Sequence, residues 1–188
     1  MDFITSDLHF GHFNMIKFSN RPFQTAKEMD AGIIEKYNST VGPHDTVYIL
    51  GDFSYKAENP ADYYLDQLNG KKIVIFGNHD KSQRHIIKNH PSVVMCADYH
   101  ELRVGDNQWV IMSHYPLAEW NGAYNGSVML HGHCHGTKKF VGRILDVGID
   151  CHGKILTLSD AIAMAKAGGD YEKVGSIYAN TNKITPVW

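Results

Sequence analysis

The sequence predicts an α/β fold of the α+β type, in which a first half of alternating strands and helices leads into a more β-rich second half. Two observations favour it. Short apolar runs alternate with capped helical segments up to residue 76, and strand-like runs separated by turn signals follow from residue 100 onward. Because no repeat, low-complexity tract or Pro/Ser-rich linker interrupts the 188 residues, we expect residues 1–188 to form a single domain.

The expected helices of the first half have recognisable ends. Thr25 can act as the N-cap of the first helix, with Glu28 as its capping-box partner. The second helix begins at Pro60 and is closed by Asn69-Gly70. The expected strands are residues 3–6, 46–50 and 72–76, and the expected helices are residues 25–37 and 60–68.

The second half begins with a hairpin signal, Gly105-Asp106-Asn107, between strands at residues 100–104 and 109–113. Ser159 is expected to cap a last helix, residues 160–167, which stops at Gly168-Gly169. Further strands are expected at residues 127–130, 142–145 and 155–157. Residues 170–188 have an ambiguous pattern, in which residues 175–179 resemble a final strand.

Composition narrows the class of partner. With 43% hydrophobic and 20% charged residues and a formal net charge of −2, the chain has no overall attraction for long nucleic acids or anionic membranes. Three cysteines without C-x-x-C spacing predict neither a disulfide framework nor a thiolate zinc site. The opening residues lack the order of a signal peptide, and no apolar run approaches the roughly 20 residues of a membrane helix. We therefore expect a cytoplasmic protein without a membrane partner.

Polar clusters follow the ends of the predicted strands. Ligands of open α/β sheets bind at the carboxyl ends of the strands, so these clusters are expected to converge at one edge. Carboxylates, an amide and imidazoles together suit Mn²⁺, Fe²⁺, Zn²⁺ or Ni²⁺, and they outnumber the ligands that one ion needs. The clusters are Asp7-x-His9, Gly51-Asp52, Gly77-Asn78-His79-Asp80, Ser113-His114 and His131-x-His133-x-His135.

The segment MLHGHCHG, residues 129–136, places three histidines at alternate positions. If it stays extended, His131, His133 and His135 project to one side of the strand, and Cys134 projects to the other. Cys134 is then expected to be a buried bystander without a redox role.

The ordered set Asp7-x-His9, Gly51-Asp52, Gly77-Asn78-His79-Asp80, His114 and Gly132-His133-x-His135 resembles the motif series of the calcineurin-like metallophosphoesterases. More narrowly, the opening Asp7-Leu-His-Phe-Gly-His-Phe-Asn, followed by Asn20-Arg-Pro-Phe23, resembles small bacterial and phage members of that superfamily. The resemblance implies two mixed β-sheets packed as a sandwich and flanked by helices, in a four-layer αββα arrangement.

The resemblance also implies a ligand set for two divalent ions, of which Mn²⁺ is the expected species, with Fe, Zn and Ni as alternatives. Asp52 would bridge the two ions. Because the other donors apart from Asp7 are neutral, two dications would leave the site net positive and suited to an anionic phosphoester. One ion would take Asp7, His9, Asp52 and His135, and the other would take Asp52, Asn78, His114 and His133.

A mechanism follows from the same resemblance: a hydroxide that bridges the ions attacks phosphorus, and a general acid protonates the leaving group. His79 is the expected acid, and Asp80 is expected to fix its tautomer and raise its pKa. His12 and Arg21 are expected to bind substrate, since an arginine can bind phosphate oxygens through two bonds. The alternative is that Arg21 shapes a loop.

The roles of three further residues are predicted less definitely. Asn14 is expected either to lie near the site or to cap a helical turn at residues 15–18. His131 is expected to support a ligand or to serve the strand. A role for His152 near the site is left open.

We expect a metal-dependent hydrolase of small phosphoesters, including nucleotide-derived ones, that prefers diesters. The run Gly51-Asp-Phe-Ser-Tyr-Lys-Ala57 departs from the Gly-Asp-x-x-Asp-Arg-Gly block of the phosphoprotein phosphatases. The alternatives are a phosphomonoesterase of the same superfamily and a non-catalytic binding module that metals stabilise. The oligomeric state stays open.

Overall fold

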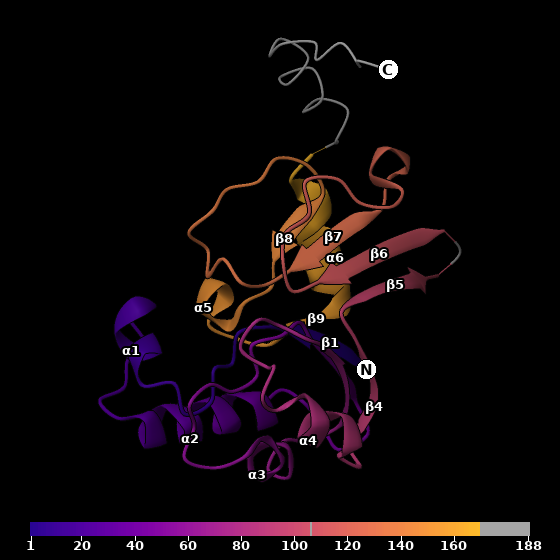
Figure 1. The fold of residues 1–188 in the computed structure, drawn as a ribbon. Coiled ribbons are helices and arrows are strands. Elements are labelled where there is room, and N and C mark those ends of the chain that lie inside the picture. The colour runs from indigo at the N-terminus through magenta and orange to yellow at the C-terminus, as the bar shows by residue number, and fades with distance from the viewer. Residues whose placement is uncertain (106, 170–188) are drawn as a thin grey trace, which may run out of the picture.

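The computed structural model describes residues 1–105 and 107–169, and these residues form two mixed β-sheets with helices (Figure 1). The first sheet has five strands in the order β4-β3-β2-β1-β9, and the second has four in the order β5-β6-β7-β8. This arrangement confirms the predicted fold class. The possible strand at residues 175–179 lies outside the described residues.

The first sheet contains four parallel strands and one antiparallel strand. Its inner and outer faces alternate along each strand as the pleat requires. Phe3 and Val47 pair and face one apolar cluster, whereas the next pair, Ile4 and Tyr48, faces the other. The strands are β1 (Asp2–Thr5), β2 (Thr46–Ile49), β3 (Lys71–Ile75), β4 (Val93–Ala97) and the antiparallel β9 (Leu156–Thr157).

Helices cover the outer face of the first sheet, where Figure 1 shows them below it. Met29 and Ile33 of one helix pack with Phe3 and Val47 of the sheet in a single buried cluster. Thr25 accepts a hydrogen bond from the backbone N–H of Glu28, so the predicted N-cap is present. The helices are α1 (Asn14–Phe18), α2 (Ala26–Asn38), α3 (Ala61–Leu65) and α4 (Arg84–Asn89).

The second sheet packs against the inner face of the first. Leu50, which follows β2, and Ile75 of β3 meet Val110 and Leu130 of the second sheet in one apolar cluster, which forms the core of the sandwich. The outer face of the second sheet is covered by a segment that contains a short 3₁₀ helix, η1 (Ala123–Asn125). The strands are β5 (Tyr99–Val104), β6 (Gln108–Ser113), β7 (Val128–His131) and β8 (Ile144–Asp146).

Two further helices lie in the second half of the chain: α5 (Ile149–His152), whose Ile149 packs in the cluster on the outer face of the first sheet, and α6 (Leu158–Ala167), which packs against strands of both sheets. The hydroxyl of Thr157 accepts a bond from the N–H of Asp160, so Thr157 and not the predicted Ser159 caps α6. Ser159 is exposed and already lies inside the helix.

Other predicted boundaries also shift. Helix α3 ends at Leu65, three residues early, because Gln67 and Leu68 donate to carbonyls three residues back and tighten the last turn. Asn14 does not cap α1, whose N-cap is Phe13 without a side-chain bond. The sequence patterns missed α4, α5 and the partly buried strand β4, which are short and lack a clear periodicity.

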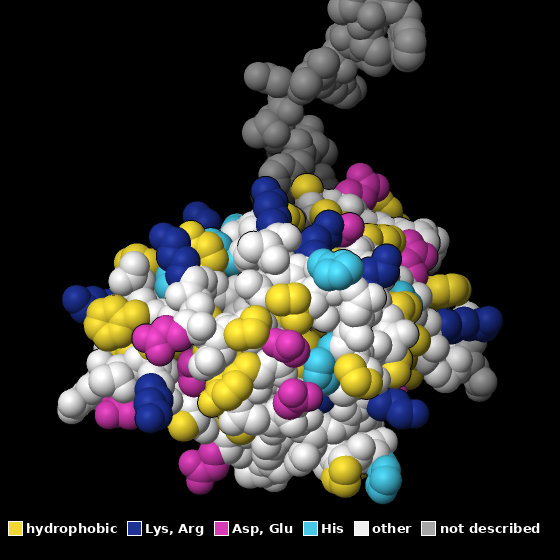
Figure 2. All heavy atoms as spheres, turned by 60° about the horizontal axis from the view of Figure 1, so that its bottom comes forward, with side chains coloured by type: hydrophobic (Ala, Val, Ile, Leu, Met, Phe, Trp, Pro, Cys, Tyr) yellow, Lys and Arg dark blue, Asp and Glu magenta, His cyan; other side chains and the backbone are white. Residues whose placement is uncertain are grey.

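Acidic and basic side chains are interspersed on the face that carries α2 to α4 (Figure 2). No continuous basic track crosses this face as drawn. Within residues 1–105 and 107–169, no helix combines the length and the apolar character that crossing a bilayer requires.

Candidate dinuclear metal site

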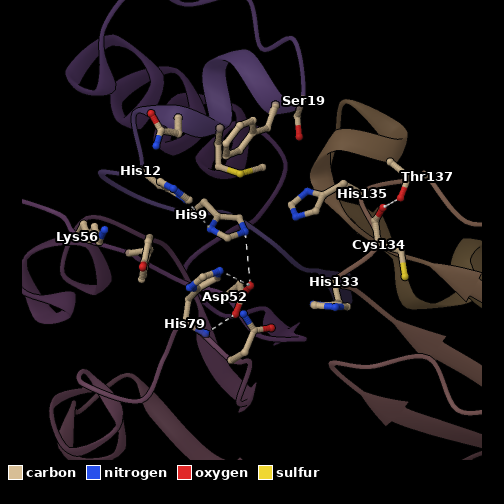
Figure 3. A pocket seen from close by; sticks show the side chains of 15 residues that line it. His9, His12, Ser19, Asp52, Lys56, His79, His133, Cys134, His135 and Thr137 are labelled. Atoms are coloured by element: carbon tan, nitrogen blue, oxygen red, sulfur yellow. Dashed lines mark hydrogen bonds and ion pairs between the residues drawn. The ribbon is translucent and has the colours of Figure 1, made fainter.

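The candidate site lies at the carboxyl ends of strands from both sheets, as the polar clusters predict. Asp7 follows β1, Asp52 follows β2, and Asn78 follows β3, while His114 and His133 follow β6 and β7. In Figure 3 the side chains of His133 and His135 face those of His9, Asp52 and His79 across a pocket. The sandwich thus brings together residues that are far apart in the chain.

Tight turns present these side chains. Non-glycine residues with a positive φ are uncommon, and in the described chain five of the seven are predicted ligands. Backbone strain of this kind is found where the surrounding structure holds a functional geometry. The five, with their φ angles, are Asp7 (58°), His9 (53°), Asp52 (52°), His133 (69°) and His135 (47°).

The turn after β7 corrects the extended reading of residues 129–136. The strand ends at His131, and the left-handed conformations of His133 and His135 place both on a turn. His131 is fully buried, and its Nδ1 donates to the carbonyl of Gly132 at 2.8 Å. Cys134 is half-buried and lines the pocket, so the expectation that alternation would bury it was wrong.

One group of possible ligands consists of Asp7, His9 and His135, whose ligand atoms all lie within 4.8 Å of one another. Oδ1 of Asp7 is 3.9 Å from Nε2 of His9 and 3.8 Å from Nε2 of His135. The second group consists of Asp52, His114 and His133 and meets the same limit.

Asn78 lies next to the second group of ligands. Its Oδ1 lies 3.0 Å from Nε2 of His114, whose Nδ1 donates to the carbonyl of Leu50 at 2.9 Å. This bond fixes the tautomer of His114 and leaves Nε2 as the ligand atom. The seven predicted metal ligands are therefore all present at one place.

Asp52, a member of the second group, also lies next to the first. Its Oδ2 is 3.5 Å from Nε2 of His9, in the first group, and 3.5 Å from Nε2 of His114, in the second. Its side chain is 2% exposed, and its Oδ1 accepts the backbone N–H of His79. Among the carboxylates of the described ligand groups, Asp52 is thus the one positioned to contact an ion in either group.

The donors fit cations. Nε2 of His9 is buried and has no hydrogen-bond partner in the described chain, so its lone pair is free for a metal. Burial lowers the pKa of His9 to about 2, which keeps the ring neutral. Burial also raises the pKa of Asp7 to about 6, because a carboxylate removed from water lacks a full counter-charge. Divalent cations would supply that charge.

Two glycines make room for the carboxylates. A Cβ at Gly132 would collide with the hydroxyl of Ser6 and lie 2.6 Å from Oδ2 of Asp7, and a Cβ at Gly77 would collide with Oδ1 of Asp52. Ser6 donates to Oδ2 of Asp7 at 2.7 Å, which orients that carboxylate.

Asp80 has a different task from the one expected. Its carboxylate is fully buried and accepts the backbone N–H groups of Gly77, Asp52 and Phe53 at 2.7, 3.0 and 2.8 Å. Both oxygens of the carboxylate take part in these bonds, so the expectation that Asp80 orients the ring of His79 is corrected. Asp80 therefore holds the turn that presents Asp52, and we treat it as a positioning residue.

His79 stands at the edge of the site, where its side chain is 30% exposed. Its Nε2 lies 3.9 Å from Oδ2 of Asp52, and its ring packs on Tyr55 with centroids 4.0 Å apart. His12 lies next to it, with Nδ1 3.2 Å from Nδ1 of His9. Both line the pocket, so the proposed roles in catalysis and substrate binding stay predictions.

Arg21 is buried and turned away from the pocket. Its guanidinium binds both oxygens of Asp150, at 2.7 and 2.9 Å, and donates to the carbonyls of Asp7 and Leu8. The expected substrate contact is therefore corrected in favour of the structural alternative. The ring of His152, whose role the sequence leaves open, also binds a backbone group, because its Nε2 donates to the carbonyl of Asp146.

Asp150 is the residue that sequence reasoning missed. Its Oδ2 accepts a bond from Nδ1 of His135 at 2.8 Å, which turns Nε2 of that ring toward Asp7. Burial alone would raise the pKa of Asp150, but the bonds from His135 and Arg21 hold it below its usual value. Asp150 is distant in the sequence from His135 and from Arg21, so no local pattern of residues predicts these contacts.

Comparisons with known proteins identify the family of the chain. The family model described as calcineurin-like phosphoesterase matches residues 3–174. The chain is 29% identical over 193 aligned residues to the Gene 66 protein of Mycobacterium phage L5, which covers 81% of this chain and 88% of that protein. It is 43% identical over 81 residues to the uncharacterized protein MJ1445 of Methanocaldococcus jannaschii, and the match spans 42% of this chain and 46% of that relative.

A solved structure shares the fold. The crystal structure of a protein of unknown function, AQ665 from Aquifex aeolicus, superposes with a TM-score of 0.67 at 22% identity, covering 87% of this chain and 98% of that one. At that identity the likeness concerns the fold alone. The family model, which spans most of the chain and includes every predicted ligand, decides the assignment: the chain belongs to the calcineurin-like phosphoesterase family.

Proposed function

We propose that the protein is a phosphoesterase that works with two adjacent divalent ions and prefers small phosphodiesters. The observation that supports this most directly is the position of Asp52, whose Oδ2 lies 3.5 Å from a histidine nitrogen of each ligand group. A carboxylate shared in this way is the arrangement that two-metal hydrolases use.

Asp7, His9 and His135 would hold one ion, and His114, His133 and Asn78 would hold the other, with Asp52 common to both. When bound, the ions supply Lewis acidity, which lowers the pKa of water and neutralises phosphoryl oxygens. The mixture of oxygen and imidazole donors suits manganese, and iron, zinc and nickel are the alternatives.

Several histidines of the pocket are neutral, so the protein's charge at the site comes mainly from its carboxylates. Burial lowers the pKa values of His9, His12 and His133, which keeps these rings uncharged. Asp7 and Asp52 are the two carboxylates among the ligands. Two dications therefore outweigh the protein charge, and an anionic ester is attracted.

His79 is our candidate for the general acid. It is partly exposed at the pocket and supported from one side by the ring of Tyr55. A proton on Nε2 would pass to the leaving-group oxygen as the ester bond breaks, which removes the cost of expelling an alkoxide.

The preference for diesters is inferred from the small number of cationic side chains that line the pocket. The guanidinium of Arg21 is occupied by Asp150, and Lys56 is the one lysine or arginine among the residues that line the described pocket. A monoester dianion calls for more charge-assisted donors than a diester, which carries one negative charge. The pocket therefore suits small diesters.

The test is hydrolysis of bis(p-nitrophenyl) phosphate and p-nitrophenyl phosphate by the full chain, before and after exhaustive chelation. We expect turnover of the diester to exceed that of the monoester, to stop on chelation and to return with Mn²⁺. Full activity of the chelated protein would contradict the proposal. Tight binding of two ions without turnover of either ester would instead favour the non-catalytic module.

A further inference from the structure

A second cluster of reactive side chains lies at the edge of the first sheet opposite the candidate metal site. It consists of Asp66, Lys72, His90 and Ser92, and we call it the serine cluster. Lys72 lies near the start of β3, and Ser92 directly precedes the parallel strand β4. The metal ligands follow the carboxyl ends of the strands, and the five residues of β3 span about 16 Å. The serine cluster is therefore separate from the site proposed above.

The backbone brings the four residues together. Asp66 is the C-cap of α3 and His90 is the C-cap of α4, two helices that pack against each other (Figure 1). The N–H of Lys72 donates to the carbonyl of Ser92 at 2.7 Å, and the N–H of Val93 donates to the carbonyl of His90 at 2.9 Å. The cluster is thus built on backbone that hydrogen bonds hold in place.

A continuous chain of hydrogen bonds links the four side chains. Nε2 of His90 lies 3.0 Å from Oδ1 of Asp66, and its Nδ1 lies 2.8 Å from Oγ of Ser92. Nζ of Lys72 lies 3.2 Å from the same Oγ. A hydroxyl, an imidazole and a carboxylate in this order have the arrangement of a serine nucleophile, its general base and the group that orients the base.

The neighbouring donors decide where the protons of this chain lie. An ammonium has no acceptor, so Lys72 donates to Oγ of Ser92. The backbone N–H of Ser92 donates to Nδ1 of His90 at 3.2 Å, so Nδ1 carries the lone pair, and Nε2 carries the proton that Asp66 accepts. The hydroxyl proton of Ser92 then points at Nδ1. This tautomer allows His90 to take the hydroxyl proton.

Burial fixes the arrangement and leaves one side of it open. His90 is 9% exposed, and Lys72 is fully buried, where its ammonium also donates to the carbonyl of Leu68. Ser92 is half-buried, and the side chain of Asp66 is 74% exposed. The fixed cation beside Oγ stabilises the negative charge that this oxygen gains as it loses its proton. The partial exposure of Ser92 leaves the residue within reach of a compact reagent.

We propose that Ser92 is the nucleophile of a second reactive site, which accepts acyl groups from small activated carboxylic esters, with His90 as its general base. Asp66 orients the imidazole, and Lys72 stabilises the alkoxide. A compact acyl group is favoured because the hydroxyl lies between two side chains that already contact it. The site uses no metal ion and does not depend on phosphoester hydrolysis.

The reaction takes two steps. Oγ of Ser92 attacks the carbonyl carbon while its proton moves to Nδ1 of His90, and the bond to the leaving oxygen breaks, so that the leaving group departs with the electron pair and receives that proton. Water then attacks the acyl carbon, His90 takes a proton from the water, and this proton passes to Oγ as the ester bond to Ser92 breaks. The sum is hydrolysis of one ester to an acid and an alcohol.

Two reagents test this in protein that exhaustive chelation has freed of metal. Diisopropyl fluorophosphate, which transfers its phosphoryl group to an activated serine and releases fluoride, should modify Ser92, and peptide mass spectrometry identifies the modified residue. The protein should also hydrolyse p-nitrophenyl acetate, and the modification should abolish this activity. An adduct at other residues alone, or acetate hydrolysis that survives modification of Ser92, would overturn the proposal.

Variants test each partner. Ser92→Ala and His90→Gln should each lower kcat/KM for p-nitrophenyl acetate at least about 100-fold, because each removes one partner of the proton transfer. Asp66→Asn, at an exposed position, should lower it at least about tenfold and slow the fluorophosphate reaction equally. Asp62→Asn, exposed on the same helix, and the exposed Ser82→Ala are matched controls and should react at the wild-type rate. Equal rates in Asp66→Asn and Asp62→Asn would show that the chain of bonds does not activate the serine.

Metal separates this inference from the proposed function. Addition of Mn²⁺ should restore hydrolysis of bis(p-nitrophenyl) phosphate, whereas the rate at which excess diisopropyl fluorophosphate modifies Ser92 should stay within about twofold of its value in chelated protein. Absence of diester hydrolysis would contradict the proposed function and leave the modification of Ser92 as support for the serine cluster. Modification of Ser92 that requires Mn²⁺ would overturn the serine cluster as an independent site.

Discussion

The carboxylate of Asp150, on α5, accepts a hydrogen bond from Nδ1 of His135, on the turn after β7, at 2.8 Å. The same carboxylate binds Arg21, 129 positions earlier in the chain. Arg21 in turn donates to the carbonyl of Asp7. One buried ion pair therefore connects the two turns that present Asp7 and His135, and it orients the first ligand group.

Asp150→Asn should weaken ion binding at the first group by about 10–100-fold, because a group that orients a ligating histidine has that effect on metal affinity. The second group should keep its ion. Metal titration by calorimetry checks this, with the exposed Asp62→Asn as the control. Equal affinities of the variant and the wild type at both groups would refute the connection.

Asp52→Asn should reduce binding at both groups, since its Oδ2 faces a histidine of each. His135→Ala should reduce binding only at the first group. Metal content after dialysis against a fixed free concentration of Mn²⁺ separates the two: about one ion for His135→Ala and less for Asp52→Asn. If Asp52→Asn retained two ions, the carboxylate would not be shared.

His79→Ala should retain both ions and lose turnover by about 10²–10⁴-fold for a poor leaving group, because protonation then has no donor. The loss should be smaller for p-nitrophenolate, which departs without a proton. Rates for a series of aryl diesters of rising leaving-group pKa measure this. His85→Ala, an exposed histidine on α4, is the control. Loss of metal in His79→Ala would mean that His79 is a ligand.

Asp80→Asn should destabilise the protein by at least about 2 kcal/mol, because an amide offers one acceptor oxygen where three backbone N–H groups converge, and each unsatisfied buried N–H costs about 1–3 kcal/mol. Urea unfolding checks this, with the exposed Asp160→Asn as the control. Unchanged stability combined with a shifted pH profile would restore the expected role beside His79.

Lys72 should make stability rise with pH. Its side chain is fully buried and its ammonium donates to the carbonyl of Leu68, and burial lowers its pKa from 10.5 to about 8. Between these values the unfolded chain binds the proton that the folded chain has released, so the free energy of unfolding increases with pH.

In Lys72→Met this contribution is absent. The free energy of unfolding of the wild type minus that of the variant should therefore increase by about 3 kcal/mol from pH 8 to pH 10.5. Urea unfolding of both proteins over this range measures the difference, in which the titrations of other groups cancel. A constant difference would show that the amine titrates normally.

The sequence by itself determined the strand-end clusters from which the candidate metal ligands come. Short apolar runs predict strands, and the polar residues after Thr5, Ile49 and Ile75 necessarily lie at strand ends. These signals are local, since each depends on a few neighbouring residues. Their order along the chain also carries the family resemblance, which the family model confirms.

The tertiary structure alone decided the supporting contacts. The pairing of Arg21 with Asp150, the three backbone bonds to Asp80 and the left-handed turn at His133 all depend on how distant segments pack. Burial makes these contacts necessary, because a charge or an N–H removed from water must find a partner. Which partner it finds depends on the topology of the sheets, and no local pattern of residues encodes that choice.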